Sequence, residues 1–484
     1  MSARPIGLAA MAIFTLVFAV KLSEAVGRFT DCAPNAAEAS PPIAAPAVTP
    51  SPPPTEIPNP ALSVAPSAAP TVAVDGPSAF SLPVPGLDRD HRRAFSVGNA
   101  LFRDNWVPAP SSAEGRDGLG PLFAATSCSA CHMDDGRGRP PMDDTDRGTG
   151  MVVFVSATSD PALPHPLLGA QLQDQATPGV EPEGAVRLVP ADIEQDGASP
   201  LLAWRVEVCT AAGEPIRDVL PSVRMGPQLI GLGLLEAVDD ATIREWADPD
   251  DRDGDGISGR VHARRTDGVD RIGRFGWKAT QPTLEEQVAA ALHGDMGLTS
   301  SRHPQEPWTD LQRASIVAPS GGEPEVDDLK VQRLAHYCRV LAVPAQRRPR
   351  DPEVVRGGEL FQSIGCAACH RPSLRTGRQS PIPSFRDVQC SAYTDLLLHD
   401  MGAGLADGRP DGDATGSEWR TPPLWGLGLI EAVNGHTRLL HDGRARSIDE
   451  AIRWHGGEAE RSLSRFMTLT DAERRAIIAF VRSL

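Results

Sequence analysis

Two CxxCH pentapeptides constrain this chain more than any other feature of its sequence. One spans Cys128 to His132 in the first half of the 484 residues, and the other spans Cys366 to His370 in the second half. In this motif the two thiols are spaced to add across the vinyl groups of one haem, and the adjoining histidine presents a nitrogen to the iron. The sequence therefore predicts two covalently bound haems c, held by Cys128, Cys131 and His132 and by Cys366, Cys369 and His370.

Two other uses of paired cysteines fit the spacing of the thiols alone. Each CxxC could be a redox-active dithiol, or the four thiolates could bind one zinc ion. Neither use requires a histidine directly after each pair, so covalent haem is the favoured interpretation. Of the remaining cysteines, Cys338 and Cys390 could form a disulfide in an oxidising compartment, while Cys32 and Cys209 have no assigned role.

The charge balance excludes two broad classes of function. The chain has 47 Lys+Arg against 63 Asp+Glu, a formal net charge of −16. An acidic chain lacks the basic field with which proteins hold nucleic acid, and its apolar residues are not gathered into repeated long spans. A nucleic-acid binder and a polytopic membrane protein are therefore both disfavoured.

The N-terminal residues predict export. An apolar run over 6–20 follows Arg4 and has the length of a signal peptide, shorter than the roughly 20 residues that cross a bilayer. Residues 1–25 are thus expected to be a signal peptide or an N-terminal membrane anchor. Residues 26–86 are rich in Pro and Ala and are expected to be a linker. The predicted location is periplasmic or otherwise extracytoplasmic, where covalent haem attachment takes place.

An internal duplication is the strongest architectural signal. Three matches recur in the same order in both halves: 120–132 with 358–370, 227–238 with 422–433, and Trp277 with His441. The first match shares GxLF, four spacer residues and CxACH, which predicts a helix before each haem motif. Two related units explain this ordered repetition better than chance does.

Local patterns predict helices in both halves and a small β region in the first. Helices are expected over 282–292, which opens with Pro and acidic residues, and over 470–481, which opens with the capping-box pattern TxxE. Short runs of alternating and β-branched residues predict strands over 151–156, 185–189 and 201–208.

Several longer motifs together resemble one known group of proteins. They are RDGLGPLFAATSCSACH, RFGWKATQPTLEEQ, GDMG, YTDLLLHDMG, EWRTPPLWGLG, LLHDGRARSIDEAI and RWHGG, and they span about 87–484. On these motifs the chain is similar to the bacterial di-haem cytochrome c peroxidase superfamily. Within it, the chain resembles the di-haem oxidoreductases, also called peroxidases or thiol oxidoreductases.

The resemblance implies a mainly α fold of two duplicated cytochrome-c-like haem domains, with a small β insertion in the N-terminal half. The N-terminal haem domain is expected over 87–345, including the β insertion and an Asp-rich loop, and the C-terminal haem domain over 346–484. One haem is expected to transfer electrons and the other to meet the substrate.

The resemblance also implies different iron environments in the two halves. In di-haem peroxidases a His-Asp-Gly segment is followed, fourteen residues after its His, by the sixth ligand of the C-terminal haem, usually Met. Here His441 is followed at that spacing by His455, which implies bis-histidine ligation through His370 and His455. Histidine in place of Met lowers the reduction potential. The alternative interpretation of His455, without the resemblance, is a surface histidine of a helix.

The residue aligned with His455 in the first repeat is Ala291, which cannot bind iron. The haem of His132 is thus expected to have an open face for peroxide or oxygen. The family's peroxidases carry a Gln and a Glu-Met-Gly segment there, matched by Gln287 and by 295–297. Asp295 would then be the acid/base that takes a proton from peroxide and returns it to the leaving oxygen. Gln287 could instead be an exposed helix residue.

Two residues near this face are alternative sixth ligands. His293 and Met296 lie close enough in the sequence to Ala291 to close the N-terminal haem at rest. Trp277 matches the tryptophan that lies between the two haems in the family, where its ring shortens the electron path, although core packing would also retain it. His399 and Met401 belong to an HDM segment of the oxidoreductase subgroup and have no assigned function.

An acidic loop suggests a second kind of metal site. Asp251, Asp253 and Asp255 alternate before Gly256 as in a calcium-binding loop, but His262 stands where an EF-hand loop ends in Glu. The loop is interpreted as a calcium site, with a solvated acidic turn as the alternative. A domain-bridging calcium also occurs in the resembled family.

The leading functional hypothesis is an exported, peroxidase-like di-haem oxidoreductase. Its expected partners are a small redox donor of the cytochrome or cupredoxin type and peroxide or another small oxidant, with no nucleic acid. The alternatives are a di-haem oxygenase or oxidase acting on an organic substrate, and a non-enzymatic electron-transfer or iron-handling cytochrome. The sequence identifies neither the electron donor nor an organic substrate.

Overall fold

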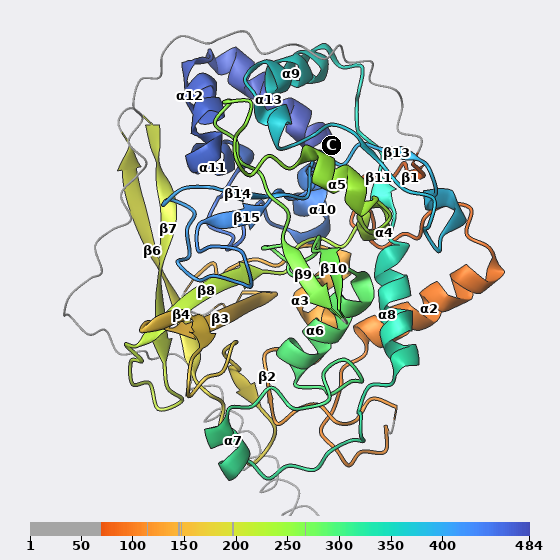
Figure 1. The fold of residues 1–484 in the computed structure, drawn as a ribbon, viewed down its shortest axis with the longest axis vertical. Coiled ribbons are helices and arrows are strands. Elements are labelled where there is room, and N and C mark those ends of the chain that lie inside the picture. The colour runs from red at the N-terminus through yellow and green to blue at the C-terminus, as the bar shows by residue number, and fades with distance from the viewer. Residues whose placement is uncertain (1–68, 114, 144–145, 147, 196–197, 267) are drawn as a thin grey trace, which may run out of the picture.

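The computed structural model describes residues 69–484 except 114, 144–145, 147, 196–197 and 267 (Figure 1). The predicted signal peptide or anchor over 1–25 lies outside the described residues, as does most of the predicted linker. The helices α9, α11, α12 and α13 of the C-terminal half gather at one end of the molecule, and α2, α6 and α8 of the N-terminal half lie below them in Figure 1.

Within the described residues the helices and strands have the following bounds. The α-helices are α2 (Arg89–Arg103), α3 (Cys128–Cys131), α4 (Leu232–Glu236), α5 (Asp240–Trp246), α6 (Leu284–Met296), α7 (Asp310–Ser315), α8 (Asp328–Arg339), α9 (Pro352–Ser363), α10 (Ile430–Asn434), α11 (Ile448–Arg453), α12 (Glu460–Thr468) and α13 (Asp471–Ser483). The strands are β1 (Thr71–Val72), β2 (Leu122–Phe123), β3 (Met151–Ala157), β4 (Asp160–Pro164), β5 (Gln175–Ala176), β6 (Ala185–Gln195), β7 (Ala198–Cys209), β8 (Val219–Met225), β9 (Ala263–Thr266), β10 (Val269–Ile272), β11 (Val343–Pro344), β12 (Leu374–Arg375), β13 (Gln389–Cys390), β14 (Leu398–Asp400) and β15 (Glu418–Arg420).

The prediction of a mainly α fold is wrong. Only 30% of the structure is helical, and 21% is in strands that form many small sheets. The difference arises because the β region is longer than the local patterns indicate, and because much of the chain between the helices runs in loops joined by two-residue ladders. In β6 and β7, apolar and polar residues alternate beyond the predicted 185–189 and 201–208, so the hairpin continues to residue 195 on one side and starts at residue 198 on the other.

The two helices and three strands expected from local patterns are confirmed. The helix expected over 282–292 is α6, whose N-cap Thr283 accepts a hydrogen bond from the Glu286 amide. The helix expected over 470–481 is α13, and Thr470 and Glu473 form the predicted capping box. The expected strands are β3, β6 and β7, with β3 paired to both β4 and β8.

Two helix pairs of the same construction stand beside the two CxxCH segments. In the first half α2 crosses α8, and in the second half α9 crosses α13. A glycine allows the close approach in each pair: a Cβ on Gly98 would lie 2.4 Å from the Arg333 carbonyl oxygen, and one on Gly357 would lie 1.9 Å from that of Ala476. Any larger residue at either glycine would force the helices apart.

Each pair also places a phenylalanine against the histidine of its motif. The Phe102 ring lies 6.4 Å from that of His132, and the Phe361 ring lies 6.3 Å from that of His370. These phenylalanines stand four residues after Gly98 and Gly357 in GNALF and GGELF. The helix before the first motif is therefore α2.

The expected helix directly before the first motif is not found there. Leu122 and Phe123 of GPLF form β2, paired with β5, whereas the matching segment of the second half lies in α9. A Cβ on Gly120 would lie 2.5 Å from the Gly297 carbonyl oxygen, so this segment is extended against the end of α6. The GxLF match is thus a similarity of sequence between a segment that forms a strand and a segment that forms a helix.

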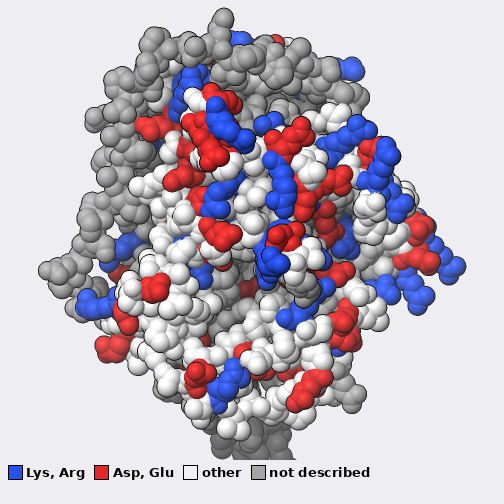
Figure 2. Space-filling view, in the orientation of Figure 1, with Lys and Arg blue, Asp and Glu red and all other residues white. Residues whose placement is uncertain are grey.

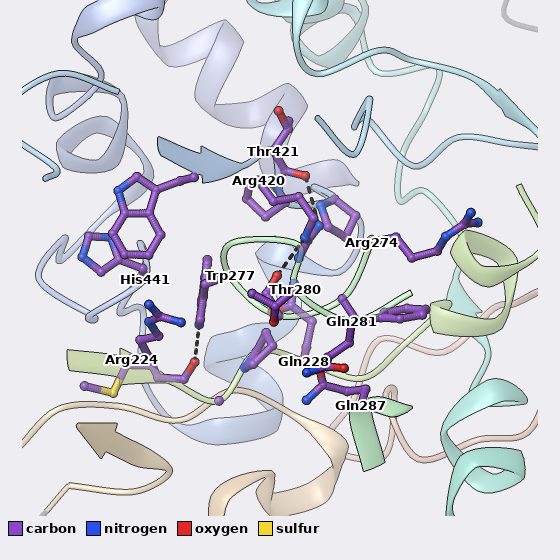
Figure 3. A pocket seen from close by; sticks show the side chains of 18 of the residues that line it. Arg224, Gln228, Arg274, Trp277, Thr280, Gln281, Gln287, Arg420, Thr421 and His441 are labelled. Atoms are coloured by element: carbon purple, nitrogen blue, oxygen red, sulfur yellow. Dashed lines mark hydrogen bonds between the residues drawn. The ribbon is translucent and has the colours of Figure 1, made fainter. Parts of the chain in front are cut away.

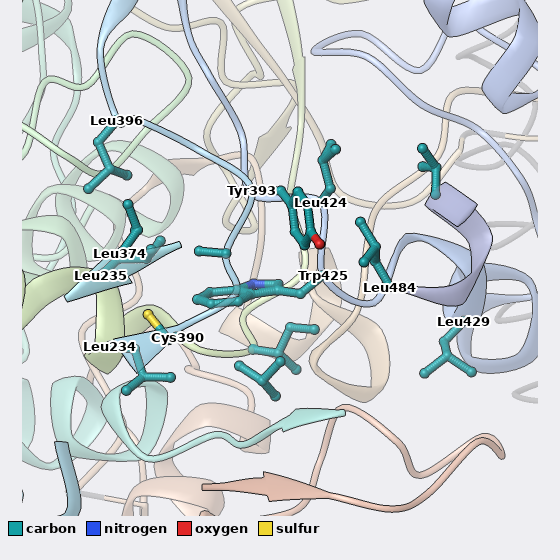
Figure 4. Packing of buried hydrophobic residues seen from close by; sticks show 14 of the residues in the cluster. Leu234, Leu235, Leu374, Cys390, Tyr393, Leu396, Leu424, Trp425, Leu429 and Leu484 are labelled. Carbon is teal, nitrogen blue, oxygen red and sulfur yellow. The ribbon is translucent and has the colours of Figure 1, made fainter. Parts of the chain in front are cut away.

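The largest hydrophobic cluster joins the two halves of the chain. Figure 4 shows Leu234 and Leu235 of α4 beside Leu374, Tyr393 and Trp425 of the C-terminal half. The two halves therefore share one hydrophobic core.

The folded part begins before Leu87, where the N-terminal haem domain was expected to start. Thr71 and Val72 pair in parallel with Val343 and Pro344, and Phe80 is fully buried in the same large cluster. The last part of the predicted linker is therefore integral to the core.

The surface carries both signs of charge. Figure 2 shows acidic and basic side chains interspersed on one face, without a broad basic area. Among the described residues, no helix is both long and apolar enough to span a bilayer.

Candidate functional site

One large cavity, of about 900 Å³, is lined by residues from both halves of the chain. Both CxxCH segments open onto it, through Cys128, Cys131 and His132 and through Cys366, Cys369 and His370. Among the described residues the six cysteines outside the disulfide at Cys209 are free thiols, and these four are among them. The structure therefore brings the two predicted attachment sites to the walls of one space.

Both motif histidines are held in the tautomer that an iron ligand needs. Nδ1 of His132 donates to the Pro227 carbonyl at 2.8 Å, and Nδ1 of His370 donates to the Tyr393 carbonyl at 2.9 Å. A carbonyl only accepts, so Nδ1 carries the proton and Nε2 keeps its lone pair. Desolvation lowers the pKa of His132, and it lowers that of His370 to about 4, which keeps both rings neutral.

The proposed sixth ligand, His455, is oriented in the same way. Its Nδ1 donates to the Ala451 carbonyl at 2.8 Å, one turn back at the end of α11, and its ring lines the cavity. Burial lowers its pKa, and its proximity also contributes to the lowered pKa of His370. The two neutral imidazoles thus line the same cavity and lie near each other in the C-terminal half.

In the N-terminal half, helix α6 lines the cavity with an alanine at the position that corresponds to His455. Ala291, aligned with His455, lines the cavity, together with Gln287, His293, Asp295 and Met296. Alanine offers no atom to a metal. The helix ends at Gly297, whose left-handed conformation (φ 64°) turns the chain away directly after these residues.

Asp295 is held by the β insertion. The side-chain amide of Gln171 donates to Asp295 Oδ1 at 2.9 Å and to the Gly294 carbonyl at 3.1 Å, and Gln173 donates to the same carbonyl at 2.7 Å. Burial raises the pKa of Asp295 to about 6, against the lowering effect of the Gln171 hydrogen bond. Such a carboxyl can both accept and return a proton near neutral pH.

The other residues of this face lie as follows. Gln287 Oε1 and His293 Nδ1 are buried without a hydrogen-bond partner among the described residues. The His293 ring stacks on that of His303 at 4.7 Å, and burial lowers its pKa to about 4. Met296 is 2% exposed and belongs to a hydrophobic cluster that also contains Leu292 and Leu298.

Trp277 stands where the two halves meet (Figure 3). Its indole Nε1 donates to the Met225 carbonyl at 2.8 Å, and the Met225 amide donates to the His441 carbonyl at 2.7 Å. The two residues matched by the internal duplication, Trp277 and His441, are thus joined through one residue of β8. The His441 ring stacks on Trp419 at 3.8 Å.

Comparison with family models identifies the chain's relatives. The model described as "Di-haem oxidoreductase, putative peroxidase" matches residues 64–153 and 214–484. The chain belongs to this family. The two matched stretches leave out most of the β insertion, including Gln171 and Gln173, and a di-haem oxidoreductase of this kind has two haems as its cofactors.

A search of solved structures gives a distant likeness. The chain is similar to the diheme peroxidase BthA from Burkholderia thailandensis E264, with 14% identity over 88% of this chain and 92% of that chain and a TM-score of 0.35. No curated protein gives a significant match.

The residues of this di-haem oxidoreductase fit two haems. Four cysteine thiols and three neutral imidazoles with free Nε2 atoms converge on one cavity, whose lining is mostly apolar. The lack of a side chain at Gly226 leaves room for the imidazole ring of His132, because a Cβ there would lie 2.9 Å from that ring.

The HDM segment of the oxidoreductase lies beside the second CxxCH motif. His399 on β14 is hydrogen-bonded to Asp395 at 2.9 Å and to Glu458 at 2.6 Å, and it lies 3.7 Å from Cys369 Sγ. Although burial opposes it, these hydrogen bonds hold the pKa of His399 well above its ordinary value. Through Glu458, His399 fixes the segment that follows His455. Glu458 also accepts hydrogen bonds from the Ser258 amide and hydroxyl, which attaches the same segment to the loop before Ser258. Met401 lines the same cavity.

The acidic loop adjoins this network. Carboxylate oxygens of Asp251, Asp253 and Asp255 lie within 4.8 Å of one another. Burial and the charges of its two neighbours raise the pKa of Asp255. The structure thus brings the three predicted calcium ligands together, and the last of them, Asp255, is three residues before Ser258.

The cysteines outside the motifs differ from the expectation. Cys338 and Cys390 are separate buried thiols, so they form no disulfide with each other, and burial raises the pKa of each to about 12. Cys338 is on α8 and Cys390 is in β13, in different parts of the core. Cys209 is disulfide-bonded.

Sequence reasoning missed two groups of residues in this oxidoreductase. Gln171 and Gln173 come from the insertion, and no motif marks them as partners of Asp295. Arg137 and Arg420 line the cavity while deeply buried; Arg137 lies outside the quoted motifs, and Arg420 lies in EWRTPPLWGLG but was given no role. Only the folded chain shows these contacts.

Proposed function

We propose that this chain is an exported peroxidase carrying two covalently attached haems c. Cys128 and Cys131 would hold the N-terminal haem, with His132 as its proximal ligand. Cys366 and Cys369 would hold the C-terminal haem between His370 and His455. When bound, the haems supply the redox chemistry and the open iron coordination site that reduction of a peroxide requires.

The observation that carries the proposal is the contrast between Ala291 and His455. Equivalent positions of the two halves hold a residue that cannot bind iron and an imidazole prepared to do so. The C-terminal site is suited to electron transfer, because two fixed imidazoles bind iron in both oxidation states with little rearrangement. The N-terminal site is suited to a small oxidant.

Asp295 supplies the proton chemistry. Oδ1 accepts from Gln171, and Oδ2 has no hydrogen-bond donor among the described residues. The carboxylate can take the proton from one peroxide oxygen at Oδ2 and return it to the other oxygen, which leaves as water. One peroxide consumes two electrons and two protons in forming two waters. Gln287, whose Oε1 has no hydrogen-bond partner among the described residues, would orient the peroxide.

Electrons would enter at the C-terminal haem from a small donor of the cytochrome or cupredoxin type and pass Trp277. The Met225 hydrogen bond fixes the plane of the indole between the two halves. Met296 belongs to a hydrophobic cluster and the His293 ring stacks on that of His303, while both side chains also line the cavity. Both remain alternative sixth ligands in this proposal.

Two further parts of the proposal concern location and calcium. Export is supported by the apolar run over 6–20 and by the disulfide at Cys209, which is typical of oxidising compartments. Calcium at Asp251, Asp253 and Asp255 is supported by their mutual spacing. A calcium titration of the chelated holoprotein, followed by calorimetry, tests the second part.

The deciding experiment is an optical and EPR titration of the purified protein with peroxide and with carbon monoxide after stepwise reduction. One haem should bind carbon monoxide and react with peroxide while the other stays low-spin. Two six-coordinate haems that respond to neither reagent would overturn the peroxidase and favour an electron-transfer protein. Oxygen consumption with an organic substrate and no peroxide would instead favour the oxygenase.

A further inference from the structure

The arginines of the cavity fall into two kinds. Six line it: Arg137, Arg224, Arg264, Arg265, Arg274 and Arg420. Four of these are buried to a similar degree, with exposed fractions of 5% for Arg137, 5% for Arg224, 4% for Arg274 and 7% for Arg420. A guanidinium so removed from water needs a compensating charge, because burial of an unpaired ion costs several kcal/mol.

Two of the four have that compensation within the protein. Arg224 donates to Asp411 at 2.8 Å, and Arg274 forms an ion pair with Asp240. Among the described residues, no carboxylate oxygen lies within 4.0 Å of a side-chain nitrogen of Arg137 or Arg420. Burial lowers the pKa of each to about 10, although the more distant charges of Asp442 near Arg137 and of Asp395 near Arg420 oppose this effect, and both remain cationic at neutral pH.

The contacts that Arg137 and Arg420 do make are with neutral groups. Arg137 donates from Nε to the Arg438 carbonyl at 3.0 Å and from Nη2 to the Leu440 carbonyl. Arg420 donates from Nε to the Gly276 carbonyl at 3.0 Å and from Nη1 to the Thr421 carbonyl at 3.1 Å. Among the described residues, Nη1 of Arg137 and Nη2 of Arg420 have no hydrogen-bond acceptor.

Both arginines also flank the same tryptophan. The Arg137 guanidinium lies over the Trp277 ring at 5.3 Å, and the Arg420 amide donates to the Trp277 carbonyl at 2.9 Å. Figure 3 shows Arg420 extending over the loop that carries Trp277. The Arg137 guanidinium and the backbone of Arg420 therefore both contact Trp277, the residue between the two halves.

We propose that Arg137 and Arg420 bind haem propionate carboxylates in the cavity beside Trp277. A propionate is an anion that arrives with the cofactor itself, and a guanidinium binds a carboxylate with strong charge-assisted hydrogen bonds. The proposal rests on the haem attachment described under the proposed function. It assigns these side chains two tasks, neutralising the propionates and fixing the edges of the haems next to Trp277.

The test compares cavity variants with a nearby arginine that does not face the cavity. The variants are Arg137→Leu, Arg137→Lys, Arg420→Leu and Arg420→Lys, each purified with its haems. Arg438→Leu is the matched control, because Arg438 is next to Arg137 and half-buried but does not line the cavity. Among the described residues, no carboxylate oxygen lies within 4.0 Å of its side-chain nitrogens. The two readouts are the resonance Raman band of propionate bending and the reduction potential of each haem.

Each Leu variant should shift the propionate band and lower the potential of at least one haem, since a cation that disfavours the ferric state is removed. The Lys variants should shift the band with a smaller change in potential, and the control should match the unaltered protein. Unchanged bands and potentials in haem-loaded cavity variants would overturn the proposal. If the Leu variants do not accumulate, the band of the Lys variants decides in the same way.

The measurement is independent of catalysis. Neither readout uses peroxide, so a wild-type protein that fails to react with peroxide would refute the peroxidase while leaving the propionate test intact. A haem stain of the denatured wild-type protein, made first, separates failure of covalent attachment from failure of the arginine sites.

Discussion

Gln171 donates a hydrogen bond of 2.9 Å to Asp295, across a sequence separation that joins the β insertion to the end of α6. The carboxyl proposed as the proton carrier is thereby placed by a segment outside the duplicated haem-binding units. Burial raises the pKa of Asp295 to about 6, and the Gln171 hydrogen bond restrains that rise by favouring the ionised form. The insertion therefore sets the pH range in which the carboxylate can accept a proton.

Replacing Gln171 by leucine should move the acidic limb of the activity profile to higher pH. The base form of Asp295 is the ionised one, so activity falls as pH drops through its pKa, and loss of the hydrogen bond raises that pKa by about one unit. The measurement is kcat/KM for peroxide against pH. Gln173→Leu is the matched control, because Gln173 donates to the Gly294 carbonyl and not to the carboxylate. Equal profiles for the two variants would contradict the assignment.

Asp295→Asn should reduce peroxidase turnover by about 10²- to 10⁴-fold, the usual contribution of a positioned acid/base. The amide keeps the size of the side chain but cannot take a proton, so binding of carbon monoxide to the N-terminal haem should be preserved. Steady-state kinetics and the carbon monoxide spectrum measure the two effects. Asp270→Asn, on the exposed hairpin strand β10, is the control. Turnover within a few-fold of wild type would remove Asp295 from the mechanism.

Sequence reasoning succeeded where the determining residues are close together in the chain. The Thr470 capping box and the start of the helix after Pro282 are local patterns, and the folded chain forms both. The roles of the CxxCH residues and of His455 stay predictions, and the structure brings all of these residues to one cavity. Thr283 caps α6, the helix that carries Gln287, Ala291 and Asp295. The helix that bears these proposed site residues was therefore predictable from the sequence.

The parts that were missed depend on contacts between distant residues. GPLF before the first motif resembles GELF before the second, but Leu122 pairs with Ala176 and Gly120 abuts Gly297, so tertiary contacts make it a strand. The mainly α expectation failed for a similar reason. Strand ladders such as Leu398 with Arg420 are too short to leave a periodic pattern.

His455→Met should raise the reduction potential of the C-terminal haem, because a thioether favours ferrous iron more than a second imidazole does. His455→Ala should convert the same haem from low-spin to high-spin, since no second ligand remains. Spectropotentiometry and EPR measure these changes. His336→Ala, at a histidine that stacks on His91 and does not line the cavity, should alter neither haem. A low-spin C-terminal haem in His455→Ala would identify a different sixth ligand.

Glu450→Ala should destabilise the protein by about 1–3 kcal/mol, because it leaves the buried Leu202 amide without its acceptor. Glu450 is 4% exposed and accepts from Leu202 at 2.8 Å, and it also pairs with Arg446, so it attaches the β6–β7 hairpin to α11. Denaturant unfolding of the holoprotein measures the loss. Asp449→Ala, at the neighbouring side chain that is 40% exposed, should cost about 0.5 kcal/mol or less. Equal losses would show that the hairpin is held by other contacts.

Trp277→Phe should slow electron transfer from the C-terminal to the N-terminal haem while leaving both haems bound. Phenylalanine keeps a ring in the space but loses the Nε1 hydrogen bond to the Met225 carbonyl, and its ring is smaller and harder to oxidise than indole. Stopped-flow mixing of the half-reduced protein with peroxide measures the rate at which the C-terminal haem is reoxidised. Trp308→Phe is the control, because Trp308 lies outside the cavity lining. A rate equal to that of the control would make Trp277 a packing residue. A slower rate with unchanged carbon monoxide binding would place it on the electron path, since the open site itself would then be intact.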